Sequence, residues 1–178
     1  MKCPTRRFLN LLELGVRMEQ MIRVGIPDLK LCKTPDKITT VGLGSCIGIV
    51  LYSAVSDICG MVHIMLPSSK EIKNNSNRAK FADTGIEDLV KLLEEKGVRR
   101  NSLSAKIAGG ATMFVFSGAS DLGSIGERNI KAVKDELATL SIPVVMEDVG
   151  ADYGRTIIFD NATKKLTVRC AGKPDKII

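Results

Sequence analysis

The chain is organised around residues 40–66, which read TVGLGSCIGIVLYSAVSDICGMVHIML and contain the one histidine of the sequence. Apolar residues dominate the runs 47–52 and 61–66, and each run has the length of a strand buried on both faces. The segment 53–57 between them is short and mostly small or polar, which is typical of a hairpin loop. We therefore expect two antiparallel neighbouring strands.

This hairpin is expected to bring a cysteine and the histidine together. With the turn centred near residue 54.5, the numbers of opposite residues sum to about 109, which places Cys46 directly opposite His63. The Cβ atoms of such a cross-strand pair are about 4.5–5.5 Å apart. The register decides this contact, because a shift of half a residue in the turn would place Ile64 opposite Cys46 and send the thiol to the other face.

Cys46 beside His63 is the pattern of an activated nucleophile. A neighbouring imidazole lowers the thiol pKa and stores the proton that the leaving group needs. We therefore expect a thiolate that attacks and an imidazolium that serves as the acid. Thr40, six residues before the cysteine, is a candidate third member that orients the imidazole through its hydroxyl or its carbonyl.

The residues before the cysteine are candidates for an oxyanion hole. Gly42 and Gly44 allow a substrate to approach the backbone closely, and amide N–H groups near Ser45 can stabilise an oxyanion. The alternative is that Cys46 is a small core residue, as most cysteines on apolar strands are. The flanking glycines and the unique histidine favour the functional interpretation. The other cysteines are expected to serve packing only; they are Cys3, Cys32, Cys59 and Cys170.

Composition limits the remaining classes of function. The 178 residues are 44% hydrophobic and 26% charged, as in a globular protein with a sizeable core. Five cysteines without a C-x-x-C pair indicate a reducing compartment, and a single histidine argues against zinc, so no metal or cofactor is expected. The net charge of +6 is spread along the chain and accompanies only seven aromatic residues, so we expect no nucleic-acid partner. No run approaches the roughly 18 apolar residues of a membrane span, and we expect a cytoplasmic protein without membrane insertion.

Outside the hairpin, helical and strand patterns alternate. We expect an N-terminal extension over residues 1–17, disordered or helical, followed by one domain over 18–178; whether Met1 or Met18 is the natural start stays open. Helices are predicted for residues 81–96 and behind the capping-box residues 124–127, and Gly109-Gly110 favours close backbone packing over phosphate binding. Further strands are predicted at 22–25, 29–32, 38–41, 103–107, 142–149, 155–159 and 165–170. This order predicts an α+β fold with mixed pairing.

These residues resemble the signature of the CheD family, the chemoreceptor glutamine deamidases of bacterial chemotaxis. The resemblance lies in Thr40-x-Gly42-Leu43-Gly44-Ser45-Cys46, followed by His63 and Pro67. Further matches are Phe81-Ala82-Asp83-Thr84, Ala105-Lys106-Ile107 leading to Gly109-Gly110-Ala111, Ile125-Gly126-Glu127-Arg128-Asn129, and Asp148-Val149-Gly150 with Gly154-Arg155. It extends over roughly residues 20–172. Ala108, Ala151 and the long N-terminal segment depart from the family pattern, and none of them touches the expected site.

The resemblance implies a fold, an activity and partners. It implies a layered α/β sandwich, with mixed β-sheets and packed helices, similar to that of cytotoxic necrotizing factor deamidases. It also implies that Cys46 is the nucleophile, His63 its acid/base partner and Thr40 the orienting residue. The implied reaction converts glutamine side chains of methyl-accepting chemotaxis receptors to glutamates through a thioester.

Two other functions stay open. Relatives in this family also bind the CheC phosphatase, so the chain is alternatively a regulatory module that acts on CheC with little or no turnover. An unrelated cysteine protease or thioesterase would cleave peptide or thioester bonds without releasing ammonia. Ammonia release from a receptor therefore distinguishes the deamidase from both alternatives.

Overall fold

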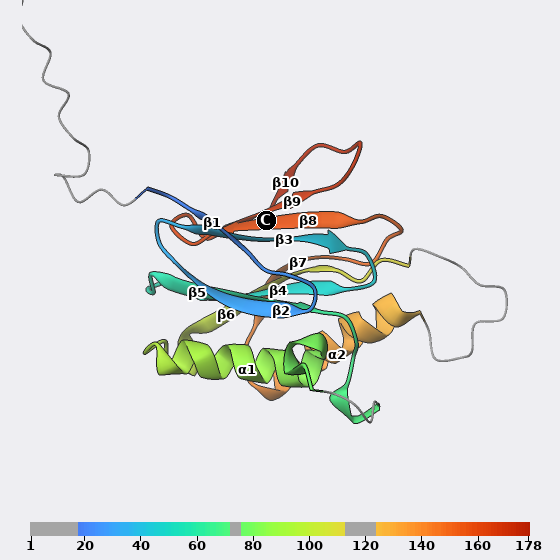
Figure 1. Cartoon of the computed structure of the whole chain (residues 1–178), viewed down its shortest axis with the longest axis horizontal. Coiled ribbons are helices and arrows are strands. Elements are labelled where there is room, and N and C mark those ends of the chain that lie inside the picture. The colour runs from blue at the N-terminus through green and yellow to red at the C-terminus, as the bar shows by residue number, and fades with distance from the viewer. Residues whose placement is uncertain (1–17, 72–75, 113–123) are drawn as a thin grey trace, which may run out of the picture.

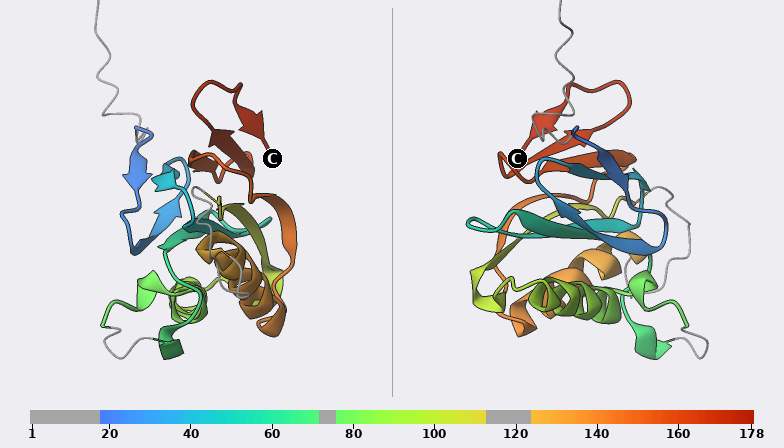
Figure 2. Two further views of the ribbon diagram at one scale, coloured as in Figure 1. Left: turned by 90° about the vertical axis from the view of Figure 1, so that its right-hand side faces the viewer. Right: turned by 60° about the vertical axis from the view of Figure 1, so that its left-hand side comes forward.

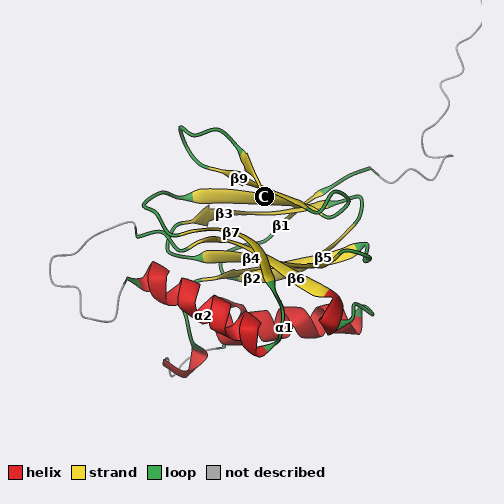
Figure 3. Cartoon of the chain, turned by 180° about the vertical axis from the view of Figure 1, so that it is seen from behind, coloured by secondary structure: helices red, strands yellow, loops and turns green. Residues whose placement is uncertain are grey.

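Two β-sheets and a pair of helices form three layers in the computed structural model, which describes residues 18–71, 76–112 and 124–178 (Figure 1). The expected extension over residues 1–17 lies outside the described residues. The outer sheet has the order β1-β3-β8-β9-β10 and the central sheet the order β2-β5-β4-β6-β7. Both helices cover the free face of the central sheet (Figures 2 and 3).

The bounds of the elements follow the predicted order. The strands of the outer sheet are β1 (Met21–Arg23), β3 (Lys37–Leu43), β8 (Arg155–Asp160), β9 (Lys165–Arg169) and β10 (Lys176–Ile177). Those of the central sheet are β2 (Asp28–Lys33), β4 (Ile47–Ser53), β5 (Ile58–Ile64), β6 (Leu103–Gly109) and β7 (Val144–Val149). The helices are α1 (Ala82–Glu95) and α2 (Ile125–Thr139), with short 3₁₀ turns η2 (Ser69–Glu71), η3 (Arg78–Lys80) and η4 (Arg100–Ser102).

Pairing within the sheets is mixed, as predicted. The pairs β1–β3 and β6–β7 are parallel, and the other pairs are antiparallel. The α+β class with mixed sheets and packed helices is therefore confirmed. The short strand β10 was not predicted, because two residues carry too little periodic signal. In the part of the chain that the structure describes, no helix is long and apolar enough to cross a membrane.

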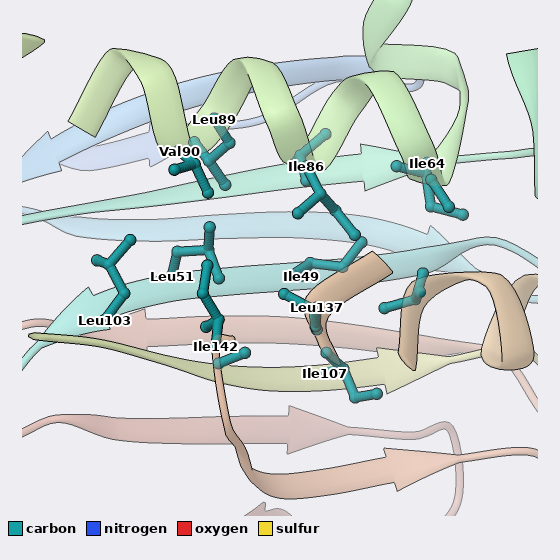
Figure 4. Packing of buried hydrophobic residues seen from close by; sticks show 14 of the residues in the cluster. Ile49, Leu51, Ile64, Ile86, Leu89, Val90, Leu103, Ile107, Leu137 and Ile142 are labelled. Carbon is teal, nitrogen blue, oxygen red and sulfur yellow. The ribbon is translucent and has the colours of Figure 1, made fainter. Parts of the chain in front are cut away.

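The helices bury one face of the central sheet. Ile86, Leu89 and Val90 of α1 recur at helical spacing and pack toward Ile49 and Leu51 of β4 (Figure 4). Full burial of one such aliphatic side chain stabilises the fold by roughly 1.5–3 kcal/mol. The second helix begins with the predicted capping box, in which the side chains of Ser124 and Glu127 accept hydrogen bonds from each other's backbone N–H.

The opposite face of the central sheet packs against the outer sheet. Here Val50 and Met61 lie in a second apolar cluster with Ile38 and Phe159 of the outer sheet. Because side chains alternate along a strand, the even-numbered residues of β4 and the odd-numbered residues of β5 face this inter-sheet layer. His63 therefore belongs to the layer between the sheets.

The predicted hairpin is confirmed, but its predicted register is wrong. Ile47 pairs with Ile64 and Gly48 with His63, so opposite residues sum to 111 and not to 109. The reason is Ser53, which was assigned to the loop but is buried in β4 and pairs with Leu103 of β6. The turn centre thus moves by one whole residue. Since the side-chain period of a strand is two, the thiol and the imidazole keep a common face and lie diagonally instead of directly opposite each other.

Candidate active site

The loop that carries the cysteine crosses from one sheet to the other. Strand β3 of the outer sheet ends at Leu43 and β4 of the central sheet begins at Ile47, so only residues 44–46 span the gap. Gly42 adopts a positive φ of 75°, and the pairing of β3 with β8 shifts between Thr40 and Leu43. A residue with a side chain is strained in this backbone conformation, so glycine is favoured at position 42.

His63 is fixed by a hydrogen bond that joins the two sheets. The imidazole Nδ1 lies 2.7 Å from the hydroxyl oxygen of Thr40, and both residues are buried. The Thr40 hydroxyl donates to the carbonyl of Val24 at 3.0 Å, so its oxygen is left to accept from Nδ1–H. The neutral imidazole consequently carries its proton on Nδ1 and its lone pair on Nε2. Among the described residues, Nε2 has no hydrogen-bond partner.

Gly48 provides the space for this contact. It lies opposite His63 in the hairpin, and a Cβ atom there would lie 2.6 Å from Cδ1 of Ile157 and 3.4 Å from Cγ2 of Thr40. A larger residue would thus enter the layer in which the imidazole meets the threonine. The sequence pointed to the glycines before the cysteine but not to this one.

Burial sets the charges of the two reactive groups. Desolvation lowers the pKa of His63 to about 4. Desolvation also raises the pKa of the half-buried Cys46 thiol, and a hydrogen bond from its own backbone N–H lowers it to a smaller extent. The sequence predicted a thiolate–imidazolium pair, but these directions favour a neutral thiol and a neutral imidazole on the common face of the hairpin. The imidazole of the resting protein is therefore a proton acceptor.

Three carbonyl groups of the nucleophile loop, residues 44–46, accept hydrogen bonds from the segment that follows β6 and from α2. The carbonyl of Gly44 accepts from the N–H of Ala111, and that of Cys46 accepts from the N–H of Gly110, each at 2.8 Å. The carbonyl of Ser45 accepts from Nδ2 of Asn129 at 2.9 Å. In a trans peptide, C=O and the following N–H point in opposite directions, so the N–H groups of Ser45 and Cys46 are turned away from these partners. Within the described ranges, neither donates a hydrogen bond to another residue.

The predicted close packing of the glycine pair is confirmed. A Cβ atom on Gly109 would lie 2.1 Å from the carbonyl oxygen of Cys46, and the N–H of Gly110 donates to that same oxygen. The pair thus supports the nucleophile loop. For a metal, the described ranges contain no group of three or more His, Cys, Asp or Glu side chains that could hold an ion.

Asn129 is the site residue that the sequence analysis missed. It is fully buried although it is polar, and it comes from the first turns of α2. A signal was present, because Asn129 precedes Val133 and Leu137 at intervals of four residues and therefore shares their buried face. A polar residue on the apolar face of a helix requires a hydrogen-bonding partner.

We predict a specific pH dependence for the reactivity of Cys46. Because burial raises the thiol pKa, iodoacetamide should alkylate Cys46 of the folded protein more slowly at pH 7 than in denaturant. The rate should rise by about tenfold per pH unit from pH 6 to 9, following the thiolate fraction. Peptide mass spectrometry of quenched samples separates Cys46 from the other cysteines. A constant, high rate between pH 6 and 7 would instead reveal a preformed thiolate.

Comparison with known proteins shows the family to which this chain belongs. The family model described as CheD chemotactic sensory transduction matches residues 65–170. A probable chemoreceptor glutamine deamidase CheD from Lachnoclostridium phytofermentans is 54% identical over 161 residues, which cover 90% of this chain and 100% of the relative. The chain belongs to the CheD family. A similarly named relative from Syntrophomonas wolfei is 51% identical over 161 residues, which cover 90% of this chain and 100% of the relative. Another from Clostridium botulinum is 52% identical over 157 residues, which cover 88% of this chain and 97% of the relative.

A solved structure offers a weaker likeness. The hypothetical protein YfiH of Bacillus licheniformis has a TM-score of 0.42 and 13% identity, covering 65% of this chain and 47% of that one. In this member of the CheD family, Thr40, Cys46 and His63 precede residue 65, where the match to the family model begins. The roles of these three residues therefore depend on the geometry described above.

Proposed function

We propose that this chain deamidates glutamine side chains of methyl-accepting chemotaxis receptors by hydrolysis, with Cys46, His63 and Thr40 as its reactive group. The names of its relatives support the substrate class. One observation carries the chemistry: the bond between Thr40 and Nδ1 of His63 leaves a lone pair on Nε2, on the sheet face that the thiol shares. A base with one fixed tautomer beside a thiol suits attack on an amide.

The first half-reaction forms a thioester and releases ammonia. Nε2 of His63 takes the proton of the Cys46 thiol while sulfur bonds to the carboxamide carbon. The negative charge that develops on the carbonyl oxygen is stabilised by the N–H groups of Ser45 and Cys46, with Gly42 and Gly44 giving the substrate close access to them. His63 then returns the proton to the nitrogen, the C–N bond breaks, and ammonia leaves.

The second half-reaction consumes one water. Neutral His63 takes a proton from the water as its oxygen attacks the thioester carbon. The C–S bond then breaks, and the proton on His63 restores the thiol. Each glutamine thus becomes a glutamate, and the protein returns to its starting state.

The low pKa of His63 determines the order of events. With the imidazole pKa at about 4 and the thiol pKa raised, the proton stays on sulfur in the resting protein. Proton transfer must therefore accompany the attack, as in general-base catalysis. Thr40 serves this step by accepting the Nδ1–H bond, which keeps the lone pair on Nε2.

Mass spectrometry of a receptor tests the proposal. A cytoplasmic receptor fragment incubated with the wild-type protein should gain about one dalton at particular glutamines and release one ammonia for each, because an amide becomes an acid. Fragment alone, and fragment with protein alkylated at Cys46, are the controls. Peptide-bond cleavage would instead indicate a protease. Absence of any mass gain on a folded fragment would reject the deamidase and favour the regulatory module that acts on CheC.

A further inference from the structure

We propose that Asn129 is a positioning residue that clamps the nucleophile loop to the end of the strand carrying His63. Its carboxamide nitrogen donates to the carbonyl of Ser45 and to the carbonyl of Met65, both at 2.9 Å. The first carbonyl directly precedes Cys46, and the second lies two residues after His63. This role rests on the proposed function, since it concerns the geometry of the same thiol and imidazole.

The clamp is placed where the two strands separate. The last ladder pair of the hairpin at this end is Ile47 with Ile64. Beyond it, the N–H of Met65 donates to the carbonyl of Lys80, so β5 has turned away from the loop. In the described part of the chain, Asn129 is the residue that bonds both sides of this opening. Its two hydrogen bonds take the place of the pair of residues that would continue the ladder beyond Ile47 and Ile64.

The same bond sets the direction of a candidate oxyanion donor. The carbonyl of Ser45 and the N–H of Cys46 belong to one planar peptide group. By holding the carbonyl, Asn129 directs that N–H away from α2. One side chain thus fixes the orientation of the peptide group that donates to the oxyanion and the separation of Cys46 from His63.

The carboxamide of Asn129 acts as a hydrogen-bond donor. In the described residues, its oxygen Oδ1 is buried without a hydrogen-bond partner, which is unfavourable and must be offset by the two bonds that the nitrogen donates. The reverse orientation of the amide would place that oxygen against two carbonyl oxygens, so the orientation is determined by the network. The helix that carries Asn129 is itself fixed, because Gly126 packs so tightly that a Cβ atom there would lie 2.5 Å from the carbonyl oxygen of Gly110.

Asn129→Ala tests the clamp with two readouts that should move in opposite directions. Deamidation of the receptor fragment should lose kcat by about 100-fold with little change in KM, because a misplacement of about 1 Å has that effect. Alkylation of Cys46 by iodoacetamide at pH 8 should become several-fold faster, because the released loop exposes the thiol to water. Both are measured at a temperature where circular dichroism shows the variant fully folded.

Two further variants separate positioning from general loss of stability. Asn161→Ala removes another buried asparagine, whose Nδ2 donates to Thr34 and to Ser56 at the far end of the hairpin. It should lose stability but keep kcat and Cys46 alkylation within about twofold of the wild type. In Asn129→Asp only the protonated carboxyl can donate, so the residual kcat should fall as pH rises, unlike that of the wild type.

The outcomes distinguish the clamp from the proposed function. If folded Asn129→Ala keeps both kcat and Cys46 alkylation at wild-type values, the clamp is overturned. If the wild-type protein deamidates no receptor fragment, the proposed function fails. The alkylation rate of Cys46 then still tests the clamp. Faster alkylation in Asn129→Ala then supports the clamp, and an unchanged rate rejects it.

Discussion

Cys46→Ala is expected to abolish ammonia release from receptor glutamines, with a rate at least about 10⁴-fold below that of the wild-type chain. Loss of a nucleophile in comparable hydrolases costs about this much or more, because binding and the oxyanion donors alone cannot form the covalent intermediate. Among the described cysteines, Cys32 and Cys59 cannot take its place, because they are buried and lie opposite each other on β2 and β5. The measurement is ammonia release together with the mass of the receptor fragment.

Cys46→Ser sharpens this prediction. A serine hydroxyl holds its proton far more tightly than a thiol, and an imidazole with a pKa of about 4 is a weak base for removing it. We expect a rate at least about 10³-fold below that of the wild type, although the two side chains have nearly the same shape.

Cys170→Ala is the matched control for both cysteine variants. It removes a half-buried cysteine just beyond β9 and should retain activity within about twofold. Receptor deamidation that persists in Cys46→Ala would contradict the assignment of the nucleophile.

The sequence could predict that the thiol and the imidazole share one face of the hairpin. This depends only on whether the numbers of opposite residues sum to an odd or to an even value. Any turn centre at a half-integer position gives Cys46 and His63 the same side of the hairpin, so an error of one residue in the turn did not matter. The position of Thr40 beside His63 agrees with its predicted place, because β3 directly precedes the nucleophile loop.

Charges and long-range contacts were not predictable in this way. The sequence analysis paired a thiolate with an imidazolium because it considered the effect of each group on its neighbour and left out the desolvation of both groups. The outer sheet covers this face and desolvates His63, which lowers its pKa and disfavours the expected imidazolium. The bond from Asn129 to Ser45 joins residues 84 positions apart, and no local pattern encodes which helix reaches the loop.

Gly109→Ala is expected to disrupt the nucleophile loop and the fold together. Gly109 has a φ of 121°, and a Cβ atom there would lie 2.1 Å from the carbonyl oxygen of Cys46 and 3.1 Å from Cα of Ile47. These neighbours are backbone atoms, so they cannot yield by a change of rotamer. We expect the free energy of unfolding to fall by about 3–5 kcal/mol, from backbone strain and overpacking together. The displaced cysteine should lower kcat by at least about 100-fold.

Gly172→Ala distinguishes contact from backbone strain. Gly172 also has a positive φ, 71°, but a Cβ atom there would meet nothing within 4 Å. Its substitution should lower the free energy of unfolding by only about 1 kcal/mol, because a side chain is strained in the left-handed conformation, and should leave kcat unchanged. Urea unfolding and the ammonia assay on both variants provide the comparison. If Gly109→Ala behaved like Gly172→Ala in both assays, the carbonyl of Cys46 would not be held against β6, and the support proposed for the nucleophile loop would be wrong.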